Sequence, residues 1–308
     1  MKALKHKDLI SILDLTTEEI EGILSLATTL KERLLKNIPS TPLSGKTLAM
    51  IFEKPSLRTR VTFETGMTQL GGHAIFLGPN DINVGVRETV ADTAKNLERL
   101  VDGIMARTFA HDTVVGLARE ASIPVINGLT ERLHPCQVLS DCFTIRERLG
   151  SVAGVKVAFL GDGNNVAHSW IYAAARLGVN FSLACPPGYE PLPEIVREGQ
   201  AEAKSEVRVT NDIAEALDGA HVVYTDVWAS MGQENEAEKR REAFAPYQLN
   251  KAALALAHPD ALVMHCLPAH RGEEITGEVI DGPQSIVFEQ AENRLHVQKA
   301  ILTLLLGE

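Results

Sequence analysis

The sequence predicts an α/β protein of two domains, each a parallel sheet flanked by helices, with a C-terminal helix that packs back on the first domain. The chain has 308 residues, more than one hydrophobic core usually serves. Short apolar runs alternate with segments of helical periodicity, which is typical of β-α units and parallel sheets. The alternation restarts after Gly150. We therefore expect a first domain at 1–149, a second at 150–290 and a returning helix within 291–308.

The first domain opens with a helix whose start is marked by a capping box. Thr16 and Glu19 stand three residues apart, and Ile20, Ile23 and Leu24 follow at helical spacing. Beyond this helix the apolar pattern alternates between strand and helix periods. The predicted strands are 47–52, 73–77, 102–106 and 123–126, and the predicted helices are 57–70, 89–100, 112–121 and 135–149.

The second domain begins with its strongest strand signal, the run Val-Lys-Val-Ala-Phe-Leu at 155–160, followed by a helix at 165–177. The polar segment 228–248 is expected to be a long loop with some helix, and long loops often carry binding residues. Further strands are predicted at 180–184, 206–209, 221–225, 261–265 and 285–288. The last helix is predicted at 291–306, with an apolar face of Leu295, Ala300, Ile301, Leu304 and Leu305.

Composition excludes several classes of function. The formal charge of −10 argues against a nucleic-acid or anionic-membrane partner, because both require a basic surface. The first residues lack the apolar stretch of a signal peptide, and no run is long enough to span a bilayer. The four cysteines are scattered without a C-x-x-C pair, which favours a reducing cytosol and gives no zinc or disulfide framework.

The segment Ser56-Leu-Arg-Thr-Arg60 is the strongest candidate for binding a small anion. It lies between the strand at 47–52, which Pro55 ends, and the helix at 57–70, for which Ser56 is a natural N-cap. A helix N-terminus offers free N–H groups, and Arg adds a planar fork that matches phosphate oxygens. The alternative is a capped helix with two solvated arginines.

Two further positions of the first domain fit a ligand cleft. Arg107 ends a predicted strand, where open α/β sheets place their ligands. His134 and Gln137 open the next helix on one face, from which both can donate to a carbonyl group. A surface arginine and a structural His-Pro turn are the alternatives.

The turn Gly161-Asp-Gly-Asn-Asn165 follows a strand and resembles a dinucleotide fingerprint only in part. Val166 occupies the third glycine position, and no acidic residue ends the following strand. We therefore expect no nicotinamide cofactor, and instead a turn from which Asn164 or Asn165 reaches into a cleft.

Later strand ends carry groups suited to an amino acid. Asp226 suits an ammonium group, and Ser230 with nearby N–H groups suits a carboxylate; a charged surface turn is the alternative. His265 and Cys266 end another strand, where adjacent side chains point to opposite faces, so this His is a poor base for this Cys. A buried inert thiol and a polar thiol lining the same cleft both remain open. Arg294 stands near the start of the last predicted helix, against the macrodipole unless an anion lies between them.

Taken in order, these motifs resemble the aspartate/ornithine carbamoyltransferase family over essentially the whole chain. Ser56-Leu-Arg-Thr-Arg60 resembles the family's carbamoyl-phosphate loop and His134-Pro-Cys-Gln137 its second signature, both shared by its two branches. Asp226-Val-Trp-Ala-Ser-Met-Gly232 and His265-Cys-Leu-Pro268 are similar to the ornithine branch. The resemblance implies an active site between the two domains and a homotrimer or a multiple of trimers.

The resemblance also assigns residues. Those implied to hold carbamoyl phosphate are Ser56, Leu57, Arg58, Thr59, Asn83, Arg107, His134, Gln137, Cys266, Leu267 and Arg294. Those implied to hold ornithine are Asn165, Asp226, Ser230 and Met231, and those expected in catalysis are Arg107, His134, Asp226 and Cys266. Asn83 would come from a neighbouring subunit; it stands where the family commonly has Gln or His, and it reaches less far.

The chemistry implied is transfer of a carbamoyl group to the δ-amine of ornithine, without metal or organic cofactor. The arginines would neutralise the phosphate leaving group, and Arg107, His134 and Thr59 would polarise the carbonyl. The proton of the amine could pass to the surroundings of Asp226 and Cys266 or to the departing phosphate. Rival substrates within the family are aspartate, putrescine and acylated ornithine. Rivals from other classes are a nicotinamide-dependent dehydrogenase and a non-catalytic amino-acid-binding module.

Overall fold

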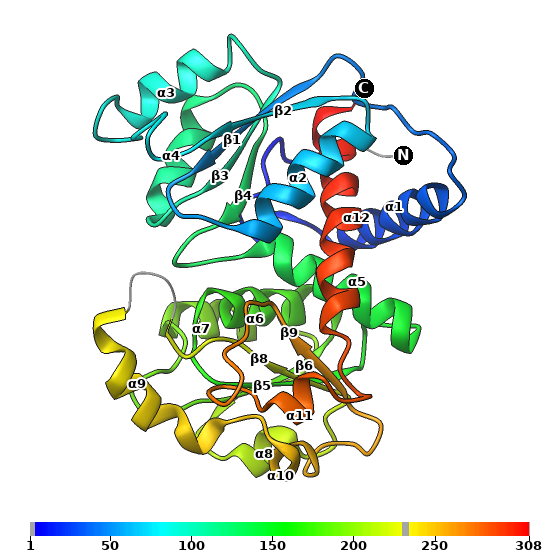
Figure 1. The fold of residues 1–308 in the computed structure, drawn as a ribbon, viewed down its shortest axis with the longest axis vertical. Coiled ribbons are helices and arrows are strands. Elements are labelled where there is room, and N and C mark those ends of the chain that lie inside the picture. Colours follow the sequence, from blue (N-terminus) through cyan, green and yellow to red (C-terminus); the bar gives the residue numbers. More distant parts are fainter. Residues whose placement is uncertain (1–3, 230–233, 308) are drawn as a thin grey trace. The chain divides into compact units, whose positions relative to one another are not determined.

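The computed structural model describes residues 4–229 and 234–307, which form two compact units (Figure 1). The first unit comprises the chain up to Phe143 and from Glu292 onwards, and the second runs from Thr144 to Ala291. Each unit contains one parallel sheet flanked by helices, which confirms the predicted fold class. None of the described helices is long and apolar enough to cross a bilayer.

The first unit has a four-stranded sheet in the order β2-β1-β3-β4. In Figure 1, α3 and α4 lie on one side of this sheet, and α1, α2 and the end of α12 lie on the other. Every neighbouring pair of strands is parallel, so the carboxyl ends share one edge. The strands are β1 (Thr47–Phe52), β2 (His73–Leu77), β3 (Gly103–Arg107) and β4 (Val125–Leu129). The helices are α1 (Thr17–Leu35), α2 (Leu57–Gln69), α3 (Val90–Leu97), α4 (His111–Glu120) and α5 (Pro135–Leu149).

The second unit has a five-stranded parallel sheet in the order β7-β6-β5-β8-β9. In Figure 1, α6 and α7 cover one face, and α8, α10 and α11 cover the other. The strands are β5 (Lys156–Leu160), β6 (Asn180–Ala184), β7 (Val207–Thr210), β8 (Val222–Thr225) and β9 (Leu262–His265). The helices are α6 (Asn165–Leu177), α7 (Pro193–Glu202), α8 (Ile213–Leu217), α9 (Ala237–Phe244), α10 (Lys251–Leu254) and α11 (Gly277–Ile280).

Capping residues mark the N-termini of several helices. Thr16 and Glu19 form the predicted capping box at α1. Ser56 caps α2, since its hydroxyl accepts a hydrogen bond from the Thr59 N–H. Pro135 is the first residue of α5, where its missing N–H costs nothing. These local rules place the ends of the helices that carry the predicted site residues.

The last helix, α12 (Val287–Leu306), begins earlier than the sequence predicts. The strand expected at 285–288 is wrong: Ser285 forms a single bridge with Val263, and the helix starts two residues later. Arg294 is therefore about two turns into the helix, too far from the N-terminus for the predicted conflict with the macrodipole.

The later part of α12 packs on the first unit, as predicted. The Lys299 ammonium donates to the Gln69 amide oxygen of α2 at 2.9 Å, and the Lys31 ammonium of α1 donates to Asn293 at 2.8 Å. Gly66 of α2 leaves room for the Lys299 side chain, since a Cβ there would lie 3.4 Å from it. Residue 294 is thus held beside the start of α2, although the two are far apart in sequence.

Candidate active site

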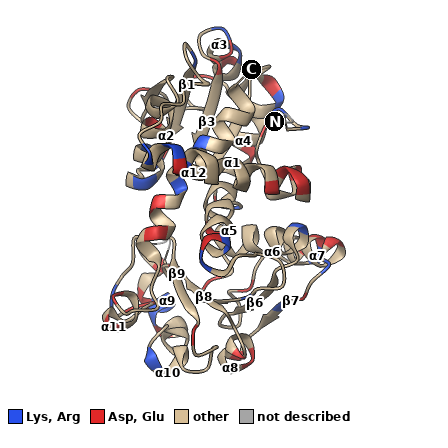
Figure 2. Ribbon diagram, turned by 90° about the vertical axis from the view of Figure 1, so that its right-hand side faces the viewer, with Lys and Arg blue, Asp and Glu red and all other residues tan. Residues whose placement is uncertain are grey.

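Basic side chains of the first unit gather at the carboxyl ends of its strands and at the first turn of α2. Arg107 ends β3 and stands in register with Phe52, the last residue of β1. Lys54 follows β1, and Arg58 lies in the first turn of α2. Figure 2 shows basic positions at this end of α2 and on the neighbouring part of α12. Because ligands of α/β sheets bind at this edge, the cluster is a candidate anion site.

Thr59 and Arg294 are joined within this cluster. The Arg294 guanidinium donates to the Thr59 hydroxyl at 2.8 Å, and both side chains are buried. Thr59 is in turn fixed by the cap at Ser56, whose hydroxyl oxygen lies 3.3 Å from the Thr59 nitrogen. Leu57, by contrast, is 73% exposed, so its side chain points away from the protein interior.

His134 lies buried among these cations at the start of α5. Burial, together with the charges of Arg294, Arg107, Lys54 and Arg58, holds the pKa of His134 well below its usual range. The imidazole is therefore neutral near pH 7. A neutral imidazole can donate a hydrogen bond to a carbonyl oxygen without carrying charge, which suits polarisation of an acyl group.

Cys136 and Gln137, in the first turn of α5, are both buried but form different hydrogen bonds. Gln137 is buried, and its amide nitrogen donates to the Asp141 carboxylate at 2.8 Å, which fixes the amide plane. Cys136 is buried, its thiol donates to the Asn127 carbonyl at 3.4 Å, and burial raises its pKa to about 12. The Gln137 amide is therefore held in one orientation, and Cys136 is an inert thiol.

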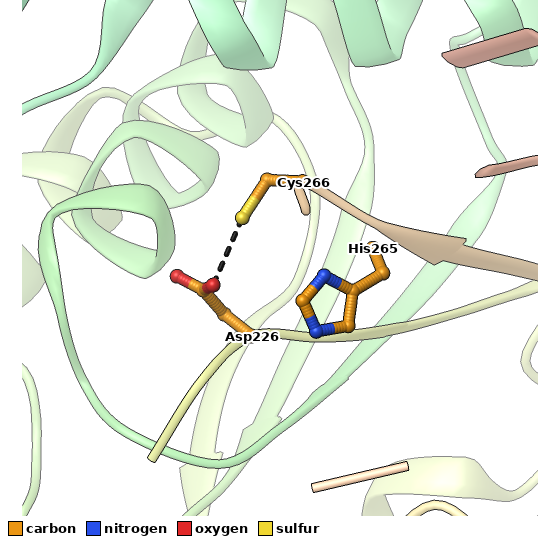
Figure 3. Close-up of side chains that lie close together, drawn as sticks. All are labelled: Asp226, His265 and Cys266. Carbon is orange, nitrogen blue, oxygen red and sulfur yellow. Dashed lines mark hydrogen bonds between the residues drawn. The ribbon is translucent and has the colours of Figure 1, made fainter. Parts of the chain in front are cut away.

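The second unit brings Asp226 and Cys266 together at the carboxyl ends of β8 and β9 (Figure 3). The Cys266 thiol donates to Asp226 Oδ1 at 2.9 Å. The same carboxylate accepts hydrogen bonds at 2.8 Å from the Asn164 amide and from the Val227 N–H. Asp226 is thus buried, and both of its carboxylate oxygens accept hydrogen bonds, as a buried polar group requires.

His265 forms a hydrogen bond with the backbone of Leu267 and none with the Cys266 thiol. Its Nδ1 accepts a hydrogen bond of 2.8 Å from the Leu267 N–H, so the ring proton is on Nε2, which lies 3.2 Å from a Glu274 oxygen. This arrangement agrees with the prediction that His265 does not act as a base for Cys266. It also holds Leu267 at a φ of 58°, a left-handed conformation that is unusual for leucine.

The ligand atoms of Asp226, His265 and Cys266 lie within 4.8 Å of one another, close enough for a metal site. Nδ1 and Nε2 of His265 are both engaged, however, so a metal ion would have to displace either the Leu267 N–H or Glu274. These residues do not fit a metal centre.

The other three residues predicted to bind ornithine are not seen in contact with Asp226. Ser230 and Met231 lie outside the described residues. Asn165 is the half-buried first residue of α6, whereas the neighbouring Asn164 makes the contact with Asp226. Asn164 is also the N-cap of α6, a role that its position before a helical run could have revealed.

Asn83 and Leu267 belong to turns. Asn83 is exposed in the loop after β2, and its carbonyl accepts from the N–H groups of Val86 and Arg87 at 3.1 and 2.9 Å. Leu267 lies directly after Cys266, in the turn that His265 supports. The hydrogen bond from the Leu267 N–H to His265 fixes the position of Leu267. The two hydrogen bonds that its carbonyl accepts fix the position of Asn83 within its loop.

A buried ion pair near Asp226 was not anticipated from the sequence. Arg240 of α9 lies 3.1 Å from the Asp162 carboxylate, and its guanidinium also donates to the Trp228 carbonyl at 2.9 Å. Burial raises the pKa of Asp162 to about 6, against the opposing effect of Arg240. Asp162 is two residues from Asn164, and Trp228 is two residues from Asp226. Only the fold reveals this pair, because 78 positions separate residues 162 and 240.

The fold and these clusters define a two-domain α/β enzyme, with a cationic site in one unit and a carboxylate–thiol site in the other. The chain belongs to the aspartate/ornithine carbamoyltransferase family. The family's carbamoyl-P binding domain matches residues 7–147, and its Asp/Orn binding domain matches residues 153–305.

Individual relatives resemble the chain over nearly its full length. The ornithine carbamoyltransferase of Syntrophus aciditrophicus is 56% identical, covering 97% of this chain and 99% of that protein. The one from Anoxybacillus flavithermus is 55% identical, with 98% of each covered. Among solved structures, ornithine carbamoyltransferase from Pyrococcus furiosus is 50% identical with a TM-score of 0.96, covering 99% of each chain. The Thermus thermophilus structure of that name is 46% identical with a TM-score of 0.88, covering 97% of this chain and 99% of that one.

Proposed function

We propose that this protein transfers the carbamoyl group of carbamoyl phosphate to the δ-amine of L-ornithine, giving L-citrulline and phosphate. The observation that carries the proposal is the full-length similarity to ornithine carbamoyltransferases at 51–56% identity. The Asp226–Cys266 pair supports the choice of ornithine, because a carboxylate attracts an ammonium group and repels a second carboxylate such as that of aspartate.

The cations of the first unit bind and activate carbamoyl phosphate. Arg58 and Arg294, with the N–H groups at the start of α2, neutralise the phosphate and make it a better leaving group. Arg107 and neutral His134 donate to the carbonyl oxygen and stabilise the oxyanion that forms there. Ser56, Leu57, Thr59 and Gln137 complete this half of the site. The buried hydrogen bond between Arg294 and Thr59 supports this division of roles.

Asp226 and Cys266 orient the amino acid. The δ-amine must lose a proton before it attacks, because its pKa in water is near that of lysine, about 10.4. Its nitrogen forms a bond to the carbonyl carbon, and the bond from that carbon to the phosphate oxygen then breaks with its electron pair. The proton lost before the attack passes to solvent, and the departing phosphate takes up the second proton, which the same nitrogen loses as the new bond forms. Asn165, Ser230, Met231 and Leu267 are proposed to line this half, and Asn164 to hold Asp226.

No metal or organic cofactor takes part in these steps. The cationic side chains do the electrostatic work, and holding both substrates in place contributes up to roughly 7–11 kcal/mol to lowering the barrier. We further propose a homotrimer, or a multiple of trimers, in which Asn83 completes the site of a neighbouring subunit. Its exposure in the loop after β2 supports this role. Arginine metabolism in the cytosol is the proposed setting.

A substrate panel tests this function. The purified protein is incubated with carbamoyl phosphate and, separately, with L-ornithine, putrescine, N-acetylornithine and L-aspartate, and ureido product is measured. Ornithine is expected to react best. Putrescine lacks the carboxylate, and acetylation blocks the α-amine. Absence of citrulline, or faster reaction with aspartate, contradicts the proposal. Arg58→Ala serves as the matched inactive control.

A further inference from the structure

A turn of the second unit brings one histidine and two glutamates together, apart from the residues assigned to the substrates. The Glu273 N–H donates to the His270 carbonyl at 2.9 Å, and the Gly272 N–H donates to the Ile275 carbonyl at 2.8 Å. Gly272 has a φ of 93°, a left-handed conformation that favours glycine. The chain therefore folds back on itself here. One ligand atom each from His270, Glu273 and Glu274 lie within 4.8 Å of one another.

Glu274 is fully buried, and only one of its carboxylate oxygens is paired. Oε1 faces His265 Nε2 at 3.2 Å and accepts a hydrogen bond from the His270 N–H. In the described part of the chain Oε2 has no hydrogen-bond partner, and His270 Nδ1, 3.8 Å away, is beyond hydrogen-bond distance. A buried carboxylate oxygen without a partner is costly. Its position beside an imidazole nitrogen indicates a place for a cation.

The other two side chains have atoms to offer and room to move. The side chains of His270 and Glu273 are 52% and 35% exposed, and both line a pocket of about 200 Å³. Among residues 4–229 and 234–307, neither ring nitrogen of His270 forms a hydrogen bond. Glu273 pairs with Arg241 at 3.2 Å, an exposed ion pair of the kind that contributes little to stability. A ligand that enters from the pocket can therefore recruit both side chains.

We propose that His270, Glu273 and Glu274 form a binding site for one divalent metal ion, and that zinc suits it best. An imidazole nitrogen favours zinc over calcium or magnesium, and the two carboxylates balance the charge of the ion. Ligands of a tetrahedral zinc ion, about 2.1 Å from the metal, lie roughly 3.4 Å apart. Small rotations of the two exposed side chains bring the three atoms to that spacing, and water fills the fourth position.

The bound ion braces the turn against the strand end that carries Cys266. It takes the free oxygen of Glu274, whose other oxygen faces His265, and His265 in turn accepts a hydrogen bond from the Leu267 N–H. The ion touches no substrate and takes no part in the transfer, so the site goes beyond the proposed function and does not depend on it. Because only the folded turn gathers the three ligands, zinc stabilises the folded protein.

Calorimetric titration of the full chain with zinc chloride, after removal of metals with a chelator, tests the inference. Wild-type protein is expected to bind one zinc ion per chain with a Kd below about 100 μM. His270→Ala and Glu273→Gln should each bind at least about a hundredfold more weakly, since even the loss of an outer partner of a metal ligand costs about 10–100-fold. Zinc should raise the Tm of wild type and not that of either variant.

X-ray absorption at the zinc edge identifies the ligands. The proposed site predicts nitrogen and oxygen neighbours only, at about 2.0–2.2 Å. A sulfur neighbour at about 2.3 Å would place the ion at Cys266 and overturn the inference.

His258→Ala and Cys266→Ser are the matched controls, and both should bind zinc as wild type does. The first removes an exposed histidine whose ring lies 5.8 Å from that of His221, an alternative surface site on the same unit. The second removes the only sulfur ligand of the Asp226 cluster. Wild-type protein that binds no zinc at this affinity overturns the inference, as does a loss of binding in either control with retention in His270→Ala. Both test variants alter exposed side chains, so folding does not obscure the result.

Discussion

The Arg294 guanidinium donates a buried hydrogen bond of 2.8 Å to the Thr59 hydroxyl, across 235 positions of sequence. Arg294 lies on α12 and Thr59 in the first turn of α2, so this bond ties the C-terminal helix to the proposed phosphate loop. It holds the guanidinium beside the start of α2, and both a guanidinium and a helix N-terminus favour a phosphate. The C-terminal helix therefore contributes directly to the candidate site.

Thr59→Val should weaken carbamoyl-phosphate binding about tenfold, because it removes the hydroxyl that orients Arg294 while keeping the shape of the side chain. Hydrogen bonds to charged groups contribute about 1.5–3 kcal/mol. Steady-state kinetics should show a raised KM for carbamoyl phosphate and little change in the KM for ornithine. Thr62→Val is the control, since that hydroxyl donates to the Arg58 carbonyl within the same helix. Equal effects of the two substitutions would refute a specific role for Thr59.

Asp226→Asn should lower kcat/KM for ornithine by at least about a hundredfold, since it removes the charge that attracts the ammonium group. Cys266→Ser should cost much less than Cys266→Ala, because the hydroxyl can still donate to Asp226. Carbamoyl-phosphate binding, followed by calorimetry, should stay within a few-fold of wild type in all three. A large loss of carbamoyl-phosphate affinity in Asp226→Asn would contradict the division of the site.

Arg240→Gln should destabilise the protein by about 3–5 kcal/mol near pH 8, because it leaves the buried Asp162 carboxylate unpaired. The folded-state pKa of Asp162 is raised from 3.8 to about 6, so the folded protein binds this proton more tightly than the unfolded chain does. The contribution of Asp162 to stability therefore falls as pH rises from about 4 to 6. In Arg240→Gln this fall in the free energy of unfolding should extend to higher pH.

Urea unfolding from pH 5 to 8 measures this effect. Asp162→Asn, which cannot ionise, is the control and should show no decline of this origin. An Arg240→Gln penalty that is the same at pH 5 and pH 8 would show that the ion pair does not stabilise the second unit.

His134 should stay neutral in the free protein through the pH range in which an ordinary histidine becomes protonated, because burial and four nearby cations lower its pKa well below the usual 6.5. Histidine C2-proton resonances, followed by NMR over this range, should include one that does not titrate. That resonance should be missing from His134→Gln. A His134 signal with a midpoint near 6.5, the ordinary value, would exclude the neutral imidazole donor proposed for the carbonyl oxygen.

Local rules of sequence were enough to predict much of this structure. The cap at Ser56, the proline start of α5 and the strand that ends just before Asp226 depend on residues close in sequence. The prediction at 285–288 was wrong because Val287 and Phe288 suit a strand locally, whereas Val287 packs in the core of the second unit as the first residue of α12.

Residues that depend on distant partners were harder to predict. Only the fold shows which of the two adjacent amides, Asn164 or Asn165, donates to Asp226: that of Asn164 does, at 2.8 Å. The Asp162–Arg240 pair leaves no trace in spacing or periodicity. The pair follows from how helix α9 lies against the strand ends of the second unit, and its charges become informative only once burial is known.

The fate of the carbamoyl carbon tests the central claim most directly. The enzyme is incubated with ¹³C-labelled carbamoyl phosphate and L-ornithine, and the product is examined by heteronuclear NMR. The proposed function predicts one labelled ureido carbon, correlated through the δ-nitrogen with the δ-methylene protons. A label attached through the α-nitrogen, or loss of the label as carbonate without any ureido product, would contradict it.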